Sequence, residues 1–211
     1  MDPNAGRAIR NTHEPLVDRV QGYGCGGVAA AHGIVDGRGG DADLAEAVVD
    51  VDVGSRGPAD DRNLAGQRVG AAEAVDLAVL VARLHTGNFD VLALRNSYHG
   101  LHFGAMTASG LALCRQPIAG APGYVHAHNP DLYRGAYGDR VDGYLDDLRR
   151  VIDSSTSGAI AGMLVEPIQG YGGVIPMPPG YLRHAAEIVR AAGGLLIADE
   201  VQTGFGRTGA L

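Results

Sequence analysis

Lysine is absent from this chain of 211 residues, whose seventeen basic side chains are all arginine. A nucleotide-binding loop of the form GxxxxGK[ST] is therefore excluded, although residues 195–200 have the shape of the strand that accompanies such a loop. Tryptophan is also absent, and 8 Tyr and 3 Phe are so few that we expect an aliphatic core. Two cysteines, Cys25 and Cys114, are too few for a disulfide framework and match no zinc spacing, which predicts a reduced compartment.

Neither charge nor hydropathy points to nucleic acid or membrane. The net charge is -7, and no basic stripe is present to neutralise phosphates. No run of eighteen apolar residues occurs, so we expect no transmembrane helix. Acidic residues near the N-terminus argue against an organellar transit peptide. The hydrophobic fraction of 45% suffices for a core, and the length predicts one domain or slightly more.

The sequence divides near residue 70. Residues 1–69 are rich in Gly, Asp and Arg, and we expect an irregular or divergent N-terminal segment there. A helix around 42–49 is the only regular element that we expect before residue 70. Gly22–Gly27 fits GxGxxG by spacing, but the preceding residues make a poor buried strand, so an ordinary glycine-rich segment is the favoured interpretation.

Residues 70–211 are strongly periodic. Ala71–His85 combines helix formers with apolar residues at Leu77, Leu80 and Leu84, which predicts a helix close to fully buried. We expect further helices at 139–152 and, opened by a proline, at 179–192, and strands at 89–94, 124–126, 159–165 and 195–198. This order predicts an α/β fold with a mainly parallel sheet and flanking helices.

Polar segments follow three of the predicted strands, at Arg95–His99, Glu166–Gln169 and Asp199–Gln202. Ligands bind beyond the carboxyl ends of parallel strands, so these segments are candidates for a site. A lone aspartate at a strand end more often caps a helix or forms a turn. His126 and His128 alternate on a strand as metal ligands do, but a surface approach to the following turn is favoured, and we predict no metal site.

The string Leu196–Gly209 (LIADEVQTGFGRTG) is far more specific than its aspartate alone. It resembles, nearly letter for letter, the motif of the class III aminotransferases, which have the fold type I large domain of pyridoxal-phosphate-dependent transferases. The resemblance implies that Asp199 pairs with the pyridine nitrogen of pyridoxal phosphate and keeps it protonated. It also implies that Val201 packs under the ring and that Gln202 hydrogen-bonds its phenolic oxygen.

Two more segments resemble the same family in the same order along the chain. In one of them Tyr98 corresponds to an aromatic residue that stacks on the cofactor, and His99 and Gly100 adjoin it. The other begins at Glu166, which corresponds to the polar group of a turn that lines the site. The resemblance covers residues 70–211, which we expect to form a partial cofactor-binding large domain.

Two parts of the family pattern are missing. The family binds the phosphate through a Ser-Gly-Ser/Thr turn at a helix N-terminus, whereas the matching residues here are Ala71 and Ala72. The Schiff-base lysine and the small domain of the family correspond to positions beyond Leu211. We therefore assign no catalytic residue and expect the chain as given to be inactive.

Softer features indicate a subfamily. His85–Asn88 and Asn129–Gly135 resemble the alanine–glyoxylate aminotransferases, and Tyr171 stands where ornithine- and GABA-type relatives carry a glutamate. The resemblance implies that the full-length parent is a homodimer that moves an amino group from L-alanine to glyoxylate, with amino acids and 2-oxo acids as its partners. We expect it to be mitochondrial in a eukaryote and cytoplasmic otherwise. A non-catalytic fragment and a class III enzyme with an ω-amine donor remain alternatives.

Overall fold

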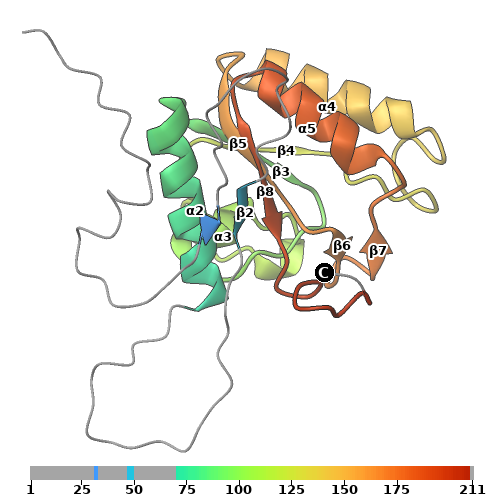
Figure 1. Cartoon of the computed structure of the whole chain (residues 1–211), viewed down its shortest axis with the longest axis horizontal. Helices are drawn as coiled ribbons and strands as arrows, with labels where there is room; N and C mark the ends of the chain where they lie inside the picture. Colours follow the sequence, from blue (N-terminus) through green and yellow to red (C-terminus); the bar gives the residue numbers. More distant parts are fainter. Residues whose placement is uncertain (1–30, 33–46, 50–69, 210–211) are drawn as a thin grey trace, which may run out of the picture.

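A six-stranded sheet is the centre of the fold in this computed structural model, which describes residues 31–32, 47–49 and 70–209 (Figure 1). Its strands, in spatial order, are β1 (Ala31–His32), β2 (Ala47–Val49), β8 (Leu195–Asp199), β5 (Ile160–Val165), β3 (Asp90–Leu94) and β4 (Tyr124–Ala127). All neighbours pair in parallel except β1 and β2. The mainly parallel sheet confirms the predicted fold class. The glycine motif at 22–27 lies outside the described residues.

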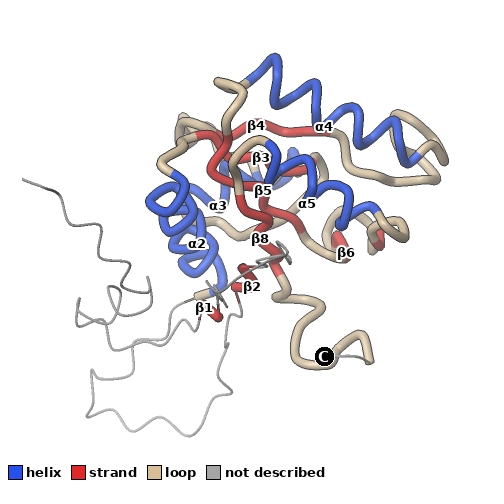
Figure 2. Tube along the Cα trace, turned by 45° about the horizontal axis from the view of Figure 1, so that its top comes forward, coloured by secondary structure: helices blue, strands red, loops and turns tan. Residues whose placement is uncertain are grey.

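Helices cover the sheet on both faces, with α2 and α3 on one and α4 and α5 on the other (Figures 1 and 2). The helical elements are α2 (Ala71–Thr86), α3 (Phe103–Ala108), the 3-10 turn η1 (Ala112–Cys114), α4 (Val141–Ser155) and α5 (Tyr181–Ala191). A separate hairpin consists of β6 (Ile168–Gln169) and β7 (Ile175–Pro176). Among the described helices, none combines the length and apolar character needed to cross a bilayer.

Alternate residues of the strands β3, β4, β5 and β8 fill two separate cores. In β3, Leu92 and Leu94 pack towards α4 and α5, whereas Val91 and Ala93 pack towards α2 and α3. All six residues of β5 are buried. A strand buried on both faces has a continuous apolar sequence, and the sequence therefore predicted the positions of these strands well.

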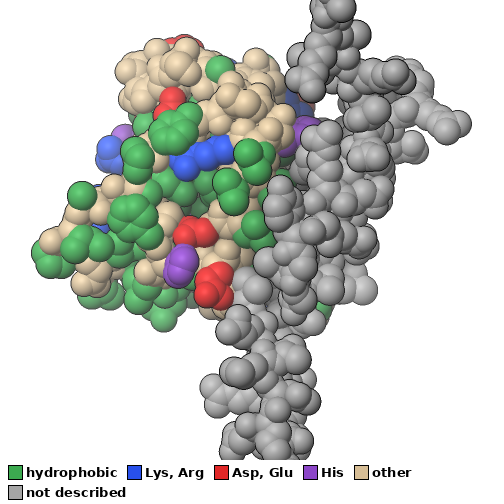
Figure 3. Space-filling model, turned by 90° about the vertical axis from the view of Figure 1, so that its left-hand side faces the viewer, with side chains coloured by type: hydrophobic (Ala, Val, Ile, Leu, Met, Phe, Trp, Pro, Cys, Tyr) green, Lys and Arg blue, Asp and Glu red, His purple; other side chains and the backbone are tan. Residues whose placement is uncertain are grey.

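The buried face of α2 differs from the one expected. Its small side chains, from Ala74 to Ala82, face the sheet, whereas Leu80 and Leu84 are 52% and 73% exposed. Alanine and valine let the helix axis lie close to the sheet, and the leucines lie on the opposite side of the helix. The prediction of a nearly fully buried helix was therefore wrong. Figure 3 shows this side of the molecule, where hydrophobic side chains lie at the surface.

Residues 47–49 form a strand, so the helix expected around 42–49 was wrong for these residues. β2 pairs in parallel with β8, with Ala47 opposite Ile197 and Val49 opposite Asp199. Two adjacent valines favour an extended backbone, and the edge of β8 offers unpaired hydrogen-bonding groups to them. The last helix also begins later than expected: Gly180 adopts a left-handed conformation (φ 80) at the N-cap of α5, so Pro179 lies outside the first turn.

Candidate cofactor site

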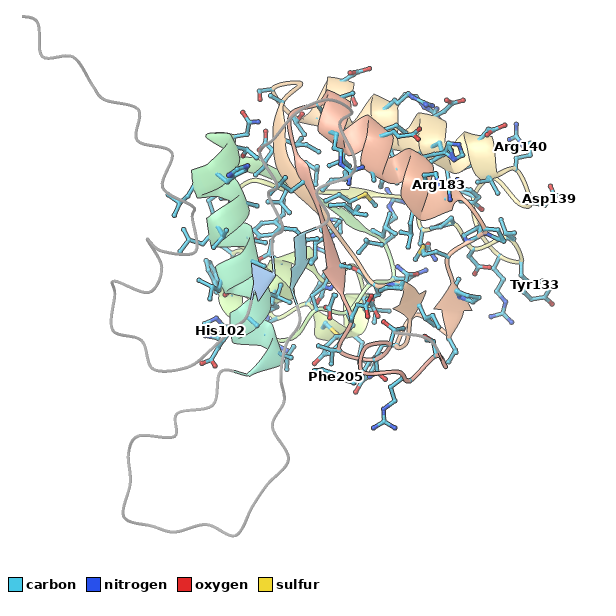
Figure 4. The ribbon with its side chains drawn as sticks, viewed as in Figure 1. His102, Tyr133, Asp139, Arg140, Arg183 and Phe205 are labelled. Carbon is cyan, nitrogen blue, oxygen red and sulfur yellow. The ribbon has the colours of Figure 1, made fainter. Side chains whose placement is uncertain are left out.

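Three neighbouring parallel strands bring the predicted site segments to one edge of the sheet. β8 pairs with β5 and β5 pairs with β3, so the residues after each strand meet at their shared carboxyl edge. Tyr98, Glu166 and Asp199 come from these three strand ends. In Figure 4 this edge lies at the foot of the sheet, between the labelled His102 and Phe205.

A cavity of about 260 Å³ opens at this edge. It is lined by Ala71, Ala72, Tyr98, His99, Gly100, Leu101, Glu166, Tyr171, Asp199, Val201 and Gln202. The structure thus brings all nine predicted site residues together around one cavity. Leu101 was not predicted, because an exposed leucine in a loop carries no sequence signal. The role of the nine residues in binding a ligand stays a prediction.

A buried histidine lies against the aspartate at the end of β8. His99 Nδ1 is 2.7 Å from Asp199 Oδ2, and both side chains are almost fully buried. Because an ionised carboxylate only accepts hydrogen bonds, Nδ1 carries the proton that joins the two groups. His99 Nε2 is buried and has no hydrogen-bond partner within the described residues. The second oxygen of the carboxylate, Oδ1, accepts from the backbone N–H of Val201 at 3.3 Å.

The backbone of His99 is held by a residue that sequence reasoning missed. The backbone N–H of His99 donates to Ser109 Oγ at 2.9 Å, and Ser109 is buried just after α3. A serine in a glycine-rich loop resembles a turn former, so nothing in the sequence identified it. Its hydroxyl fixes the loop that carries His99 into the cavity.

Glu166 is the buried carboxylate at the end of β5. Its Oε1 accepts from the backbone N–H of Tyr98 at 2.7 Å, and its Oε2 accepts from that of Gly170 at 3.0 Å. Burial raises the pKa of Glu166 above its usual value, although these two hydrogen bonds and the nearby His99 oppose the rise. Glu166, which we expected to be the polar group of the turn, therefore binds the backbone of two segments, one at Tyr98 and one at Gly170.

Two tyrosines lie side by side in the cavity wall. The ring centroids of Tyr98 and Tyr171 are 4.5 Å apart, with the ring planes tilted by 38°. Burial, chiefly, raises the pKa of the Tyr98 phenol. Tyr171 is 64% exposed, so it forms the outer part of the wall. Tilted rings at this separation attract each other.

The N-terminus of α2 forms another wall. Ala71 and Ala72 belong to its first turn, where backbone N–H groups have no partner within the helix. Gly100 lies directly against Ala72: a Cβ at Gly100 would come within 2.4 Å of the Ala72 Cβ, and the φ of Gly100 is +110. Only glycine allows this close approach of the loop to the helix. Glu73 accepts the backbone N–H of Gly70 at 2.7 Å.

Val201 and Gln202 line the cavity from the turn after β8 and are both exposed. The two histidines considered as metal ligands lie elsewhere. His126 Nε2 donates to the carbonyl of Ala108 at 2.9 Å, and His128 is hydrogen-bonded to Asp147. Within the residues that the structure describes, no group of three potential ligands surrounds a metal position.

The cavity fits the cofactor that the motif implies. A carboxylate and the N–H groups of a helix N-terminus both border it, and these are the groups that a protonated ring nitrogen and a phosphate require. The groups predicted to hold pyridoxal phosphate, namely Asp199, Gln202, Val201, Tyr98 and the first turn of α2, all line this cavity; their role in binding it stays a prediction.

Comparisons with known proteins identify the family. The sequence model of the family described as Aminotransferase class-III matches residues 64–211. The mitochondrial alanine–glyoxylate aminotransferase 2 homolog 2 of Arabidopsis thaliana is 46% identical over 137 residues, which are 65% of this chain and 28% of that protein. The mitochondrial alanine–glyoxylate aminotransferase 2 of Homo sapiens is 35% identical over 160 residues, 65% of this chain and 31% of that protein.

Solved structures give the same result. The (S)-enantioselective omega-transaminase of Thermomicrobium roseum superposes with a TM-score of 0.63 at 36% identity, over 68% of this chain and 34% of that one. A PLP-bound amine transaminase from an uncultivated Pseudomonas species gives a TM-score of 0.61 at 33% identity, over 67% and 35%. The chain thus spans about a third of the length of the relatives it matches. It belongs to the class III aminotransferases, whose cofactor is pyridoxal phosphate.

Proposed function

We propose that these residues form the cofactor-binding part of the large domain of an aminotransferase that moves an amino group from L-alanine, or a similar amino acid, to glyoxylate. One observation carries the proposal: Asp199 stands in a cavity that also contains Tyr98, Glu166 and the N-terminus of α2. The identity of 46% with a plant alanine–glyoxylate aminotransferase supports the substrate pair. The homodimer, and a mitochondrial location in a eukaryote with a cytoplasmic one otherwise, belong to the same proposal.

Each of these cavity residues has a defined role in the proposed function. When bound, pyridoxal phosphate supplies an electron-accepting ring that stabilises the charge left when an amino acid loses its Cα proton. Asp199 would hold a proton at the ring nitrogen, and His99, which donates to Asp199 at 2.7 Å, keeps the carboxylate in place. Tyr98 and Val201 would pack against the ring, and the α2 N-terminus would bind the phosphate.

A class III enzyme with an ω-amine donor is the second candidate. The fold likeness to the omega-transaminase of Thermomicrobium roseum supports it. Tyr171 in the cavity wall favours the first candidate, because an aromatic ring offers no charge to balance the second charged group of an ω-amino acid. Donor screening of a full-length version distinguishes the two.

Cofactor binding can be tested on the 211-residue chain itself. Pyridoxamine 5′-phosphate is a suitable ligand because it has no aldehyde and binds without a lysine. We expect Asp199→Asn to weaken its binding by at least about tenfold in calorimetric titrations, since a hydrogen bond to a charged group contributes about 1.5–3 kcal/mol.

The exposed Asp153 in α4 provides the matched control, Asp153→Asn, which we expect to bind as the unmodified chain does. Equal affinities of the two variants would show that Asp199 does not contact the ligand. No binding by the unmodified chain would refute the assignment of the cavity.

A further inference from the structure

Glu166 joins two segments that are far apart in the sequence. Its side chain is 5% exposed, and each carboxylate oxygen accepts one backbone N–H. One donor, Tyr98, follows β3, and the other, Gly170, lies in the turn between β6 and β7. A carboxylate can accept at both oxygens at once, whereas an amide side chain has only one oxygen.

Each of the two donor N–H groups lies in the backbone next to a tyrosine ring. Tyr98 is itself a donor, and Tyr171 directly follows Gly170, so the carboxylate fixes the backbone beneath both rings. The same two segments approach each other closely nearby: a Cβ at Gly172 would come within 2.6 Å of the Asn96 carbonyl oxygen. Gln169 Nε2 also donates to the carbonyl of Arg95 at 3.0 Å. Among these contacts between the two segments, only the hydrogen bonds of Glu166 involve an ionisable side chain.

A buried carboxylate is costly at this position. No arginine forms an ion pair with Glu166 within the described ranges, and the like-charged Asp199 lies nearby. Burying a charge destabilises a fold unless hydrogen bonds compensate. Both hydrogen bonds of Glu166 go to the segments that carry the aromatic pair, so a neutral residue of similar size would fill the space but would not join them.

We propose that Glu166 is a positioning residue, whose single carboxylate ties the Tyr98 segment to the β6–β7 turn and so holds Tyr98 and Tyr171 together as one aromatic wall of the cavity. The wall is the surface against which the cofactor and the amino-acid substrate are held. The identity of these ligands rests on the proposed function, whereas the tie between the two segments does not.

The chain contains no tryptophan, so Tyr171→Trp introduces a unique fluorophore into the wall. Acrylamide quenching and anisotropy of Trp fluorescence then report how firmly the residue at 171 is held, without any ligand. We expect adding Glu166→Gln to lower the anisotropy, as for a side chain released into fast motion. The quenching constant should rise by less than about twofold, because residue 171 is already 64% exposed. The exposed Glu187 of α5 provides the matched control, Glu187→Gln, which should leave the quenching constant and the anisotropy unchanged.

A pH titration tests the tie without altering Glu166. A protonated carboxyl loses one acceptor, so quenching in the Tyr171→Trp chain should rise as pH falls through the pKa of Glu166. Burial places that pKa above its ordinary value of 4.5, with His99 and Asp199 as the charged groups facing it. The same step should be absent when Glu166→Gln is also present. Identical quenching in the Glu166→Gln and Glu187→Gln chains would overturn the proposal, and so would a pH titration unaffected by Glu166→Gln. The proposal would also fail if the Trp at position 171 were as accessible to acrylamide as free tryptophan when Glu166 is present.

Binding of pyridoxamine 5′-phosphate separates this proposal from the proposed function. We expect Glu166→Gln to weaken binding by up to about tenfold, because a loosened wall must be ordered when the ligand binds, and Glu187→Gln to leave it unchanged. A loosened fluorophore with unchanged affinity would refute the role of the wall in holding ligands. If no chain binds the ligand, the proposed function fails, and the quenching data still decide whether Glu166 joins the two segments.

Discussion

Ala72 stands in the first turn of α2, beside the free backbone N–H groups of the helix and against Gly100. Its methyl group lines the cavity but donates no hydrogen bond. The helix end is positive, and it also carries the carboxylate of Glu73, which accepts the N–H of Gly70 at 2.7 Å. Within the described residues of this turn, a phosphate would therefore contact backbone N–H groups but no hydroxyl, beside the Glu73 carboxylate.

Restoring a hydroxyl at position 72 should strengthen this site. We expect Ala72→Ser to raise the affinity for pyridoxamine 5′-phosphate by about tenfold, because a hydrogen bond to a phosphate contributes about 1.5–3 kcal/mol. Calorimetric titration measures the change. Ala191→Ser, at an exposed position of α5, is the matched control and should have no effect. An unchanged affinity of the Ala72→Ser chain would place the phosphate elsewhere.

The sequence identified the residues of the cavity better than their contacts. Its family-like segments named nine lining residues, because residue types at strand ends and at a helix start can be matched position by position. The contact between His99 and Asp199, 100 positions apart, depends on the register of β3, β5 and β8. The aromatic pair of Tyr98 and Tyr171 depends on a hairpin turn. Neither register nor turn geometry follows from local periodicity.

At the scale of elements, α2 and α3 are joined through one carboxylate. Asp76 of α2 accepts the backbone N–H of Ala105 at 2.7 Å and thereby caps the six-residue helix α3. His102 Nδ1 lies 2.6 Å from the same carboxylate, and that hydrogen bond raises the pKa of His102 above 6.5. α3 follows directly on the loop that contains Gly100, so this junction supports a wall of the cavity.

The junction predicts a dependence of stability on pH. Because the folded-state pKa of His102 is raised, its contribution is fully present below pH 6.5 and is lost as pH rises through the raised value. Thermal unfolding should show that His102→Gln lowers the melting temperature slightly below about pH 6 but not above about pH 9. The effect is small because the side chain is exposed.

The exposed His85 at the end of α2 serves as the comparison, since it makes no ion pair within the described part of the chain. If His85→Gln and His102→Gln change the melting temperature equally at every pH, the pair with Asp76 contributes nothing.

Long periodic elements were predicted from the sequence, whereas short ones were not. The helices α2, α4 and α5 and the strands β3, β4, β5 and β8 lie within a few residues of their expected bounds. The helix α3 was missed because six residues carry no full hydrophobic period, and its cap comes from another helix. The strand β2 was missed because three residues acquire a strand conformation only by pairing with β8.

At the scale of the whole molecule, the absence of lysine has a direct chemical consequence. Pyridoxal phosphate forms covalent bonds with amines, and the only amine in this chain is its N-terminus. After incubation with pyridoxal phosphate and borohydride, peptide mass spectrometry should find no adduct on any side chain. A lysine-containing protein treated in parallel shows that reduction occurred. A modified internal peptide would contradict the expectation that this chain binds the cofactor only by noncovalent contacts.

The place of β8 in the sheet has a consequence for folding. β8 is the last strand along the described chain, yet it lies between β2 and β5. During synthesis, β2 and β5 emerge first and cannot share a sheet until residues 195–199 arrive between them. Pairing over such sequence separations is slow and leaves strand edges exposed meanwhile. Asp199 enters the cavity in the same step in which β8 completes the sheet. Substitutions that delay this late insertion will therefore lower the yield of native chain, even when they leave the final fold unchanged.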